Sequence, residues 1–428
     1  MKKIVLISVL LLSCLSSDFT FAQGEAALPF LQIPTNPEML GMGYASVAHI
    51  TDNPAALTTN PAHLGMQSLN NSFFTLNENY SDWIPSFHIY DADLWIRTIV
   101  ANAGTNFNKF YPQLPPVSVG ISYSNIHFHS DNFYPGSGPD ASYQSADYDE
   151  SNQVTLGLGI DYFVRVSIGF TYKHITSVIN HYPTAGEQEY GPASANLYDL
   201  GFLIDAPLVS ITSKIINQPV KINNSISPLV NFSLGISKSN LGQESISYMD
   251  PGQADPLPRL ARAGIGLTLG FQYDKNDITL TPLSFNWTVE ANDLCVKYNS
   301  AGLPIYQPGL GDINFFKEVI LGKTNKETDK LKGWELNFFE SVYIYGGSFS
   351  EDPDNGNRNF KTGGYSVSLS GLLKTFALID PGIFEDNFMK YVLNHIGIKY
   401  NQSLVNTPDS ILNNTQFYSL NFTFNNWL

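Results

Sequence analysis

The sequence predicts an all-β protein, a transmembrane antiparallel β-barrel of about 14 strands with an N-terminal hatch, or plug, in its lumen. Three observations lead to this prediction. Strand-like segments alternate apolar side chains with glycine, serine and threonine. Long polar stretches separate many of these segments from one another. A Gly- and Ala-rich stretch that is broken by prolines, Met39–Gly65, precedes them all.

The first residues predict export from the cytoplasm. Two lysines precede the apolar run Ile4–Leu12, and Thr20-Phe21-Ala22 places small residues where a signal peptidase reads the chain. We therefore expect residues 1–22 to be a signal peptide. A second interpretation stays open, because the sequence that ends at Cys14 resembles a lipobox, in which Cys14 would become a lipidated N-terminus.

The composition restricts the class of protein. The net charge of −15 argues against a nucleic-acid partner, because it repels phosphates. Charged residues are few, at 14%, and aromatic residues are frequent, at 13%, which suits an outer-membrane barrel. After removal of the signal, Cys295 is the remaining thiol, so we expect neither an intramolecular disulfide nor a cysteine metal site.

Alternation with a period of two is the main evidence for strands. In Val154–Tyr162 and Val164–Lys173, every second residue is apolar, and only Phe163 separates the two segments, which predicts a tight hairpin. Leu260–Tyr273 follows the same pattern, and Gly333–Ser350 is expected to be one long strand. A soluble β-sandwich also alternates. Its solvent face would carry lysine and glutamate, whereas here the polar face is small, as a filled lumen requires.

The ends of the predicted strands support a membrane barrel. Tyrosine and tryptophan near strand ends (Tyr123, Tyr162, Tyr273, Tyr400 and Trp427) suit interfacial aromatic girdles. The last predicted strand has an apolar face, and the final residue, Leu428, lies in phase with it. Four long polar stretches are assigned to extracellular loops: 130–152, 181–196, 243–258 and 350–361. Two segments, 312–323 and 383–392, are candidates for short helices.

The N-terminal region resembles the PorV/PorQ proteins, which belong to the broader FadL-like outer-membrane family. The resemblance lies in Phe30-Leu31, Leu40-Gly41-Met42-Gly43-Tyr44-Ala45, Asp52 and Asn60-Pro61-Ala62-His63-Leu64. Leu257-Pro258-Arg259, ahead of a predicted strand, is also similar to PorV-type members. His63 stands where family members often have glycine. The remainder of the chain resembles the family in pattern and length only.

The resemblance implies a domain order and a set of hatch residues. Residues 23–68 would form the hatch and 69–428 the barrel. Gly41, Gly43, Asn60, Pro61 and Ala62 would lie in the hatch and gate the lumen. Asn53-Pro54-Ala55 is interpreted as an unrelated echo of the family motif at Asn60. Small residues suit a plug, prolines keep it out of the barrel sheet, and the two asparagines can cap turns.

The resemblance also implies a function in the outer membrane of a Gram-negative bacterium of the Bacteroidota type. The first expectation is a non-enzymatic barrel that supports type IX protein secretion or surface attachment, with outer-membrane lipid, secretion components or exported proteins as partners. The alternative is a FadL-like gated channel for hydrophobic small molecules. A lipid-acting enzyme is the third interpretation. No cofactor and no catalytic residue are predicted, and the ligand-binding residues are not identified.

Two further motifs could bind metal ions. His127 and His129 lie two apart on one strand face, as metal ligands can, but a strand end near a loop explains them better. Glu351–Gly356 resembles a calcium loop without its later bidentate glutamate, so an acidic turn is preferred. The sequence therefore predicts no metal site.

Overall fold

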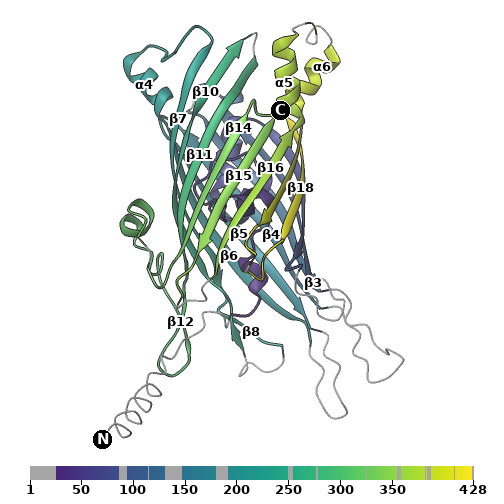
Figure 1. The fold of residues 1–428 in the computed structure, drawn as a ribbon, viewed down its shortest axis with the longest axis vertical. Coiled ribbons are helices and arrows are strands. Elements are labelled where there is room, and N and C mark those ends of the chain that lie inside the picture. Colours follow the sequence, from purple (N-terminus) through teal and green to yellow (C-terminus); the bar gives the residue numbers. More distant parts are fainter. Residues whose placement is uncertain are drawn as a thin grey trace, which may run out of the picture.

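The computed structural model describes residues 26–428 except 86–93, 114, 131–146, 180–190, 249–253, 276–277, 324, 354–357, 381, 383–386, 409 and 427–428. In this part of the chain, 14 strands close into one antiparallel barrel, and β1 pairs with β18 to complete the ring (Figure 1). The predicted fold class and strand number are confirmed. No helix among these residues is long and apolar enough to cross a membrane. The predicted signal peptide, Cys14 and Trp427 lie outside the described residues.

Each barrel strand pairs with its neighbours along the chain, apart from two connections that carry small hairpins of their own. The barrel strands are β1 (Phe73–Trp83), β2 (Leu94–Asn106), β3 (Val117–Ser130), β4 (Tyr148–Asp161), β5 (Arg165–Val178), β6 (Ala193–Pro207), β7 (Ile226–Gly242), β10 (Leu260–Lys275), β11 (Ile278–Leu294), β14 (Asp329–Phe338), β15 (Val342–Ser350), β16 (Asn359–Ser368), β17 (Ile396–Val405) and β18 (Gln416–Asn425). The hairpins are β8–β9 (Ser245–Ile246 and Asp255–Pro256) and β12–β13 (Val296–Tyr298 and Pro304–Tyr306).

Short helices precede the barrel and interrupt its connections. Four belong to the N-terminal segment: η1 (Pro29–Gln32), α2 (Pro37–Gly41), η2 (Pro54–Thr58) and α3 (Ala62–Asn70). The others are η3 (Phe107–Lys109), α4 (Leu208–Ile216), the π-helical turn η5 (Phe315–Ile320), α5 (Leu369–Ile379) and α6 (Asn387–His395). The helix predicted within 312–323 corresponds to η5, and the described part of 383–392 lies in α6. The sequence pattern predicted neither α4 nor α5.

The alternation along the strands has the predicted orientation. On β4, Val154, Leu156 and Leu158 are exposed on the outer wall, whereas Thr155 and Gln153 are buried against the lumen. The same holds around the ring, so the barrel has an apolar outer surface and an inner surface of small and polar side chains. An apolar outer surface on a closed barrel suits a lipid environment, because no backbone edge is left unpaired.

One strand prediction and part of the girdle prediction were wrong. Gly333–Ser350 is not one strand but the hairpin of β14 and β15, which turns at Phe339 and Glu340 with left-handed backbone (φ 56° and 52°). Tyr123 lies in the middle of β3 and Tyr400 in the middle of β17, where neither can form part of a girdle at a strand end.

The two ends of the barrel differ. At the end that we call the turn end, β1 begins and β18 finishes, and Tyr162-Phe163-Val164 forms the predicted tight connection between β4 and β5. Helices α4, α5 and α6 extend the wall there. The opposite end, the loop end, holds the connections that follow β1, β3, β5, β7, β11, β15 and β17. The described flanks of all four predicted long loops lie at the loop end, and 131–146, 180–190, 249–253 and 354–357 lie outside the described residues.

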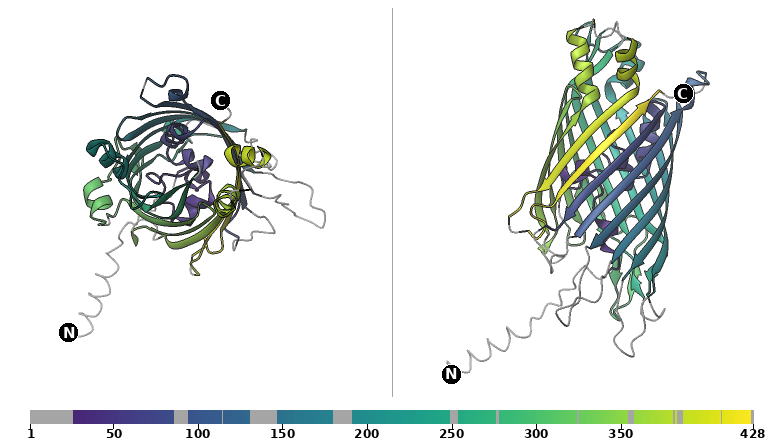
Figure 2. Two further views of the ribbon diagram at one scale, coloured as in Figure 1. Left: turned by 90° about the horizontal axis from the view of Figure 1, so that it is seen from above. Right: turned by 90° about the vertical axis from the view of Figure 1, so that its right-hand side faces the viewer.

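The N-terminal segment runs through the inside of the barrel. Ala27 N–H donates to Pro256 O at the loop end (2.8 Å), and Asn426 N–H donates to Ser72 O at the turn end (2.7 Å). Between these points, α2 packs against β15–β18 and α3 against β2–β6. Viewed along the barrel axis, the purple segment lies within the ring of strands (Figure 2). We call residues 27–72 the plug.

Candidate functional site: the contact between plug and barrel wall

Both Asn-Pro-Ala tripeptides form the same capped turn. The side-chain oxygen of Asn53 accepts from Ala55 N–H (3.0 Å), and that of Asn60 accepts from Ala62 N–H (3.1 Å). Proline follows each asparagine, where its fixed φ suits the first helical residue. η2 begins at Pro54, and α3 begins at Ala62, directly after Pro61. The two tripeptides thus share one turn geometry, and the interpretation of the first as an echo of the family motif stays a prediction.

Asn60 also ties the plug to the wall. Its amide nitrogen donates to Val47 O within the plug (2.9 Å) and to Phe202 O on β6 (3.1 Å). Next to it, Ala62 O accepts from the Ser167 hydroxyl of β5 (2.6 Å). Pro61 lies against Gly169, where any side chain would overlap the Pro61 backbone. These three predicted hatch residues thus meet the wall at β5 and β6.

Replacing Asn60 with alanine is expected to loosen the plug locally. The substitution leaves the buried Phe202 carbonyl and Ala62 N–H without their partner, which costs about 1–3 kcal/mol for a buried polar group. Amides of α3 should then exchange with deuterium faster, by roughly tenfold for each 1.4 kcal/mol lost. Hydrogen–deuterium exchange with mass spectrometry measures this. Asn223→Ala, in an exposed connection outside the barrel, is the matched control and should leave α3 unchanged.

Gly41 and Gly43 meet the opposite side of the wall. A Cβ on Gly41 would lie 3.0 Å from Tyr345 Cβ and 3.4 Å from Ser403 Cβ. Gly43 has left-handed backbone (φ 66°), and its Cβ would overlap Ser348 N and lie 2.8 Å from Lys332 O. Its own N–H donates to the Thr362 hydroxyl (2.9 Å). The absence of a side chain at both positions lets the plug backbone touch the main chain of the barrel.

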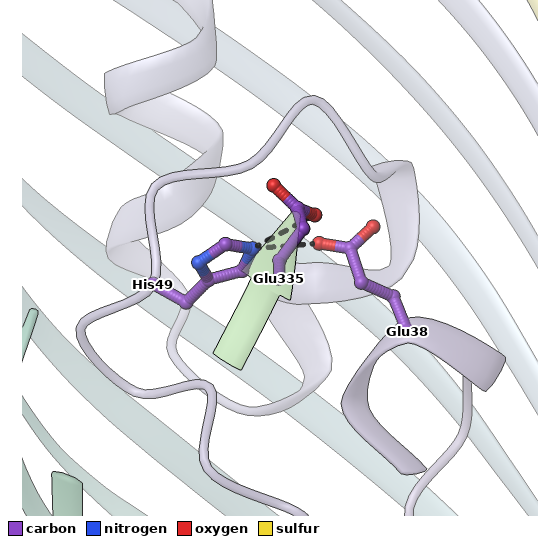
Figure 3. A group of neighbouring side chains, drawn as sticks. All are labelled: Glu38, His49 and Glu335. Atoms are coloured by element: carbon purple, nitrogen blue, oxygen red, sulfur yellow. Dashed lines mark hydrogen bonds and ion pairs between the residues drawn. The ribbon is translucent and has the colours of Figure 1, made fainter. Parts of the chain in front are cut away.

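A layer of buried charges joins plug and wall at mid-height of the plug. His49 Nε2 lies 3.1 Å from Glu38 Oε1 and 3.7 Å from Glu335 Oε2 of β14 (Figure 3). Buried Lys399 of β17 lies 3.9 Å from Glu38 Oε2, and it also lies 3.0 Å from Oδ1 of Asp52, whose side chain is exposed. Sequence analysis missed this layer, because its members are far apart in the chain and no local motif marks them.

Glu38, His49 and Glu335 also form a group whose ligand atoms all lie within 4.8 Å of one another, as a metal site requires. The surrounding donors favour an ion-paired network instead. Glu38 accepts from the Asn53 amide (3.3 Å) and faces Lys399, and Glu335 accepts from the Asn286 amide (2.5 Å). Both carboxylates thus have donors from the protein itself. A protonated His49 between them would complete the ion-paired network.

A second buried carboxylate holds the plug backbone directly. Glu290 Oε2 on β11 accepts from the N–H groups of Ser46 and Val47, both at 2.8 Å. Its other oxygen accepts from Arg262 of β10 (2.9 Å). All three of these partners are removed from solvent or nearly so. The wall thus contributes a charged side chain that recognises two consecutive peptide groups of the plug.

The lumen changes character towards the loop end. Many inward-facing residues there are apolar and form two clusters around the plug, although Gln153, Lys173 and Arg262 also lie beside Phe30. One cluster surrounds Leu28 and Phe30 of the plug, and its wall residues are Ile96, Ile126, Ile175, Ala193, Ala195 and Leu197. The other surrounds Met39, Leu40 and Tyr44, and its wall residues are Leu331, Phe349, Phe360, Val405 and Phe417. We call these two apolar clusters, which contain side chains of both plug and wall, the apolar chamber.

The turn end of the lumen is polar. A cavity of about 380 Å³ opens between the plug and the wall there. It is lined by Thr51, Asp52 and Gln67 of the plug and by Tyr343 and Lys399 of the wall, among others. From the loop end to the turn end, the lumen thus passes from an apolar chamber, through the charged layer, into a polar vestibule.

The other candidate motifs lie away from the plug. His127 and His129 face outwards, where Trp95 packs against both rings with centroids 5.4 and 5.2 Å apart. They belong to an aromatic cluster of the outer wall. Glu351 forms a two-point ion pair with Arg358 (2.8 and 2.9 Å), and 354–356 of the proposed calcium loop lie outside the described residues. His49, His63 and His174 contact carboxylates, a carbonyl and an amide, so none of these three pairs with a serine as a hydrolase would require.

Fold and site together define a class: a closed 14-stranded barrel of the outer-membrane type whose lumen is occupied by its own N-terminal segment. No family model and no curated protein matches the chain. Among solved structures, it is similar to the Pseudomonas putida toluene transporter TodX (10% identity, TM-score 0.38, covering 91% of this chain and 96% of that one). It is also similar to a Pseudomonas aeruginosa FadL homologue (10%, 0.37, 92% and 98%) and to the translocator domain of the Neisseria meningitidis autotransporter NalP (9%, 0.37, 83% and 89%). Similarity at this level carries no conclusion about cargo.

Proposed function

We propose that this protein is an outer-membrane channel for hydrophobic small molecules, gated by movement of the plug. The observation that supports the proposal is the apolar chamber at the loop end. Inward-facing residues of a water-filled pore are polar, whereas here two groups of isoleucine, leucine and phenylalanine side chains pack around the plug near the mouth. Leu28 and Phe30 fill the chamber in the described state. A hydrophobic solute gains about 1.5–3 kcal/mol for each comparable side chain that it replaces.

The charged layer supplies the gate in this proposal. A hydrophobic solute cannot pass between Glu38, His49 and Lys399 without separating them, and the separated charges would be unpaired in a buried site. The layer therefore keeps the chamber closed towards the turn end. Because part of the layer belongs to the plug and part to the wall, displacement of the plug would separate its members and open the path. The residues predicted as gate residues, Gly41 and Gly43, hold the plug on this side.

A disulfide between plug and wall tests the gate. Cβ atoms at Gly41 and Ser403 would lie 3.4 Å apart, close to the usual disulfide separation of about 3.8 Å. Gly41→Cys/Ser403→Cys is expected to lower uptake of radiolabelled toluene or oleate by intact Gram-negative cells at least tenfold under oxidation. Reduction with dithiothreitol should restore it. Burial raises the pKa of the Cys295 thiol to about 11, so this native thiol stays protonated and does not interfere.

The matched controls are the two single variants, Gly41→Cys and Ser403→Cys, which should transport equally with and without oxidant. Unchanged uptake in the oxidised double variant would show that the plug does not need to move. If cells that carry the wild-type protein take up no more of either compound than cells without it, the hydrophobic cargo is wrong irrespective of the gate.

The type IX secretion role that the PorV/PorQ resemblance implies stays a prediction. Most of the matching residues from Phe30 to Leu64 are buried inside the barrel, with Leu31 and Asp52 as exceptions. An exported protein docking on the outside would not reach them. The motif is therefore explained by the packing of the plug, and it supports a secretion role less directly than the apolar chamber supports a hydrophobic cargo.

A further inference from the structure

Three lysines gather on the outer wall near the loop end. On β14, Lys330 and Lys332 lie at alternate positions before Trp334 and face outwards as it does. Lys361 of β16 also faces outwards. The register places Lys332, Ser348 of β15 and Lys361 in one row across three strands. With strands about 4.8 Å apart, the two lysines of this row flank Ser348 at roughly 10 Å from each other.

The strand between the lysines makes a groove. Ser348 and Ser350 of β15 are small, and they form the floor between the longer side chains of β14 and β16. A cavity of about 650 Å³ lies there, lined by Lys330, Lys332 and Lys361 together with Asn359 and the start of the connection after β17 at Asn406–Pro408. The groove has room for a headgroup and is rimmed by cations.

The cations of the groove have no counterion among the described residues. In the described part of the chain, none of the three ammonium groups lies in an ion pair, and no carboxylate lines the cavity. Lys330 Nζ donates to Gly322 O, which leaves its charge unbalanced. The chain has 38 acidic and 23 basic residues, so three unpaired lysines side by side are not expected from composition. A bound anion would balance the positive charge of the three lysines.

Apolar side chains lie beside the groove. η5 folds onto the outside of the wall, where Val319 covers the outward-facing Ile265 of β10 and Ala291 of β11 (the short green helix beside the barrel in Figure 1). Phe316 of η5 is 65% exposed, and Leu321 after it is 54% exposed. The carbonyl that Lys330 contacts belongs to the residue after Leu321. Cationic and apolar groups thus lie near one another on the outer wall towards the loop end.

We propose that the Lys330–Lys332–Lys361 groove binds the phosphate of a phosphorylated glycolipid in the outer leaflet of the outer membrane. Its phosphate would contact the ammonium groups of Lys332 and Lys361, and its acyl chains would lie along Trp334 and the exposed side chains of η5. An ammonium group is a phosphate ligand that needs no fixed geometry. The proposal requires that the loop end faces the cell exterior, and it does not depend on the cargo of the channel.

Native mass spectrometry of the detergent-purified protein with bisphosphorylated lipid A tests the proposal. The wild-type protein should retain lipid A, and Lys330→Gln/Lys332→Gln/Lys361→Gln should retain at least tenfold less. Ser348→Trp keeps every charge but fills the floor of the groove, and it should reduce binding to a similar degree. The matched control, Lys109→Gln/Lys214→Gln/Lys221→Gln, removes three exposed charges at the turn end and should bind as the wild-type protein does.

Unheated gel electrophoresis shows whether each variant remains a folded barrel, and Ser348→Trp provides a test if the triple variant does not fold. Wild-type binding in a folded triple variant or in Ser348→Trp would overturn the proposal, and so would equal loss in the turn-end control. Phosphatidylglycerol and inorganic phosphate identify the source of the phosphate. If either binds as tightly as lipid A with the same dependence on the lysines, the glycolipid assignment is wrong.

Discussion

Gly43→Val is expected to prevent the plug from seating in the barrel. Gly43 has left-handed backbone, which costs a β-branched residue about 1–3 kcal/mol. Its Cβ would also overlap main-chain atoms of Ser348 on β15 and approach Lys332 O on β14. Unlike a side chain, a hydrogen-bonded strand cannot rotate away. We expect a total loss of several kcal/mol in plug docking, while the strand pairs of the barrel remain.

Planar-bilayer recordings and limited proteolysis measure this outcome. The variant should show an open conductance that the wild-type protein lacks, and its plug should become sensitive to protease. Gly191→Val is the control, because nothing lies within 4 Å of a Cβ at that position, and it should behave as the wild-type protein does. A closed, protease-resistant Gly43→Val barrel would show that the wall yields locally, and the close approach would then have no role in holding the plug.

Glu290→Leu is expected to release the middle of the plug. The substitution leaves Arg262 buried without its carboxylate, which costs about 3–5 kcal/mol. It also leaves the N–H groups of Ser46 and Val47 without their acceptor, at about 1–3 kcal/mol each. These costs overlap, because the groups share one acceptor, but the sum remains large. Amides of residues 44–49 should lose most of their protection from hydrogen exchange.

The double variant Arg262→Leu/Glu290→Leu separates the two contributions. It removes the unpaired charge but not the two unpaired N–H groups, so protection of residues 44–49 should recover in part and not fully. If the single and double variants are equally protected, the ion pair makes no contribution. If the double variant recovers completely, the carboxylate acts on Arg262 alone, and the two backbone contacts are not needed.

The outer wall could be predicted from the sequence, because each strand carries its orientation in its own alternation. The hairpin at Phe339–Ser341 shows where this signal fails. Trp334, Leu336 and Phe338 before the turn and Val342 and Ile344 after it all lie at even positions, so the apolar phase continues through the turn unbroken. Alternation shows which side chains share a face of the sheet. It cannot reveal a reversal of chain direction that leaves the even-numbered positions on the same face.

The plug could be predicted in composition but not in its contacts. Glycine, alanine and proline in Met39–Gly65 indicated a compact segment. The charged layer could not be predicted, because Glu335 and Lys399 look like ordinary inward-facing strand residues until the plug supplies Glu38 and His49. The same holds for Glu290, whose partners are backbone groups and carry no sequence signal. Contacts of this kind depend on the closure of the ring.

The path of the plug constrains how the molecule is assembled. The closing seam joins β1 to β18, with pairs such as Asn77 and Asn421 that are 344 positions apart, and contacts so distant in the chain form late. The residues around Ala27 must reach the loop end before that seam closes. If the ring closed first, the plug would have to thread through the finished barrel and form its wall contacts one after another. The last step of folding is therefore a wrapping step, in which the sheet curls around a core that is already in place.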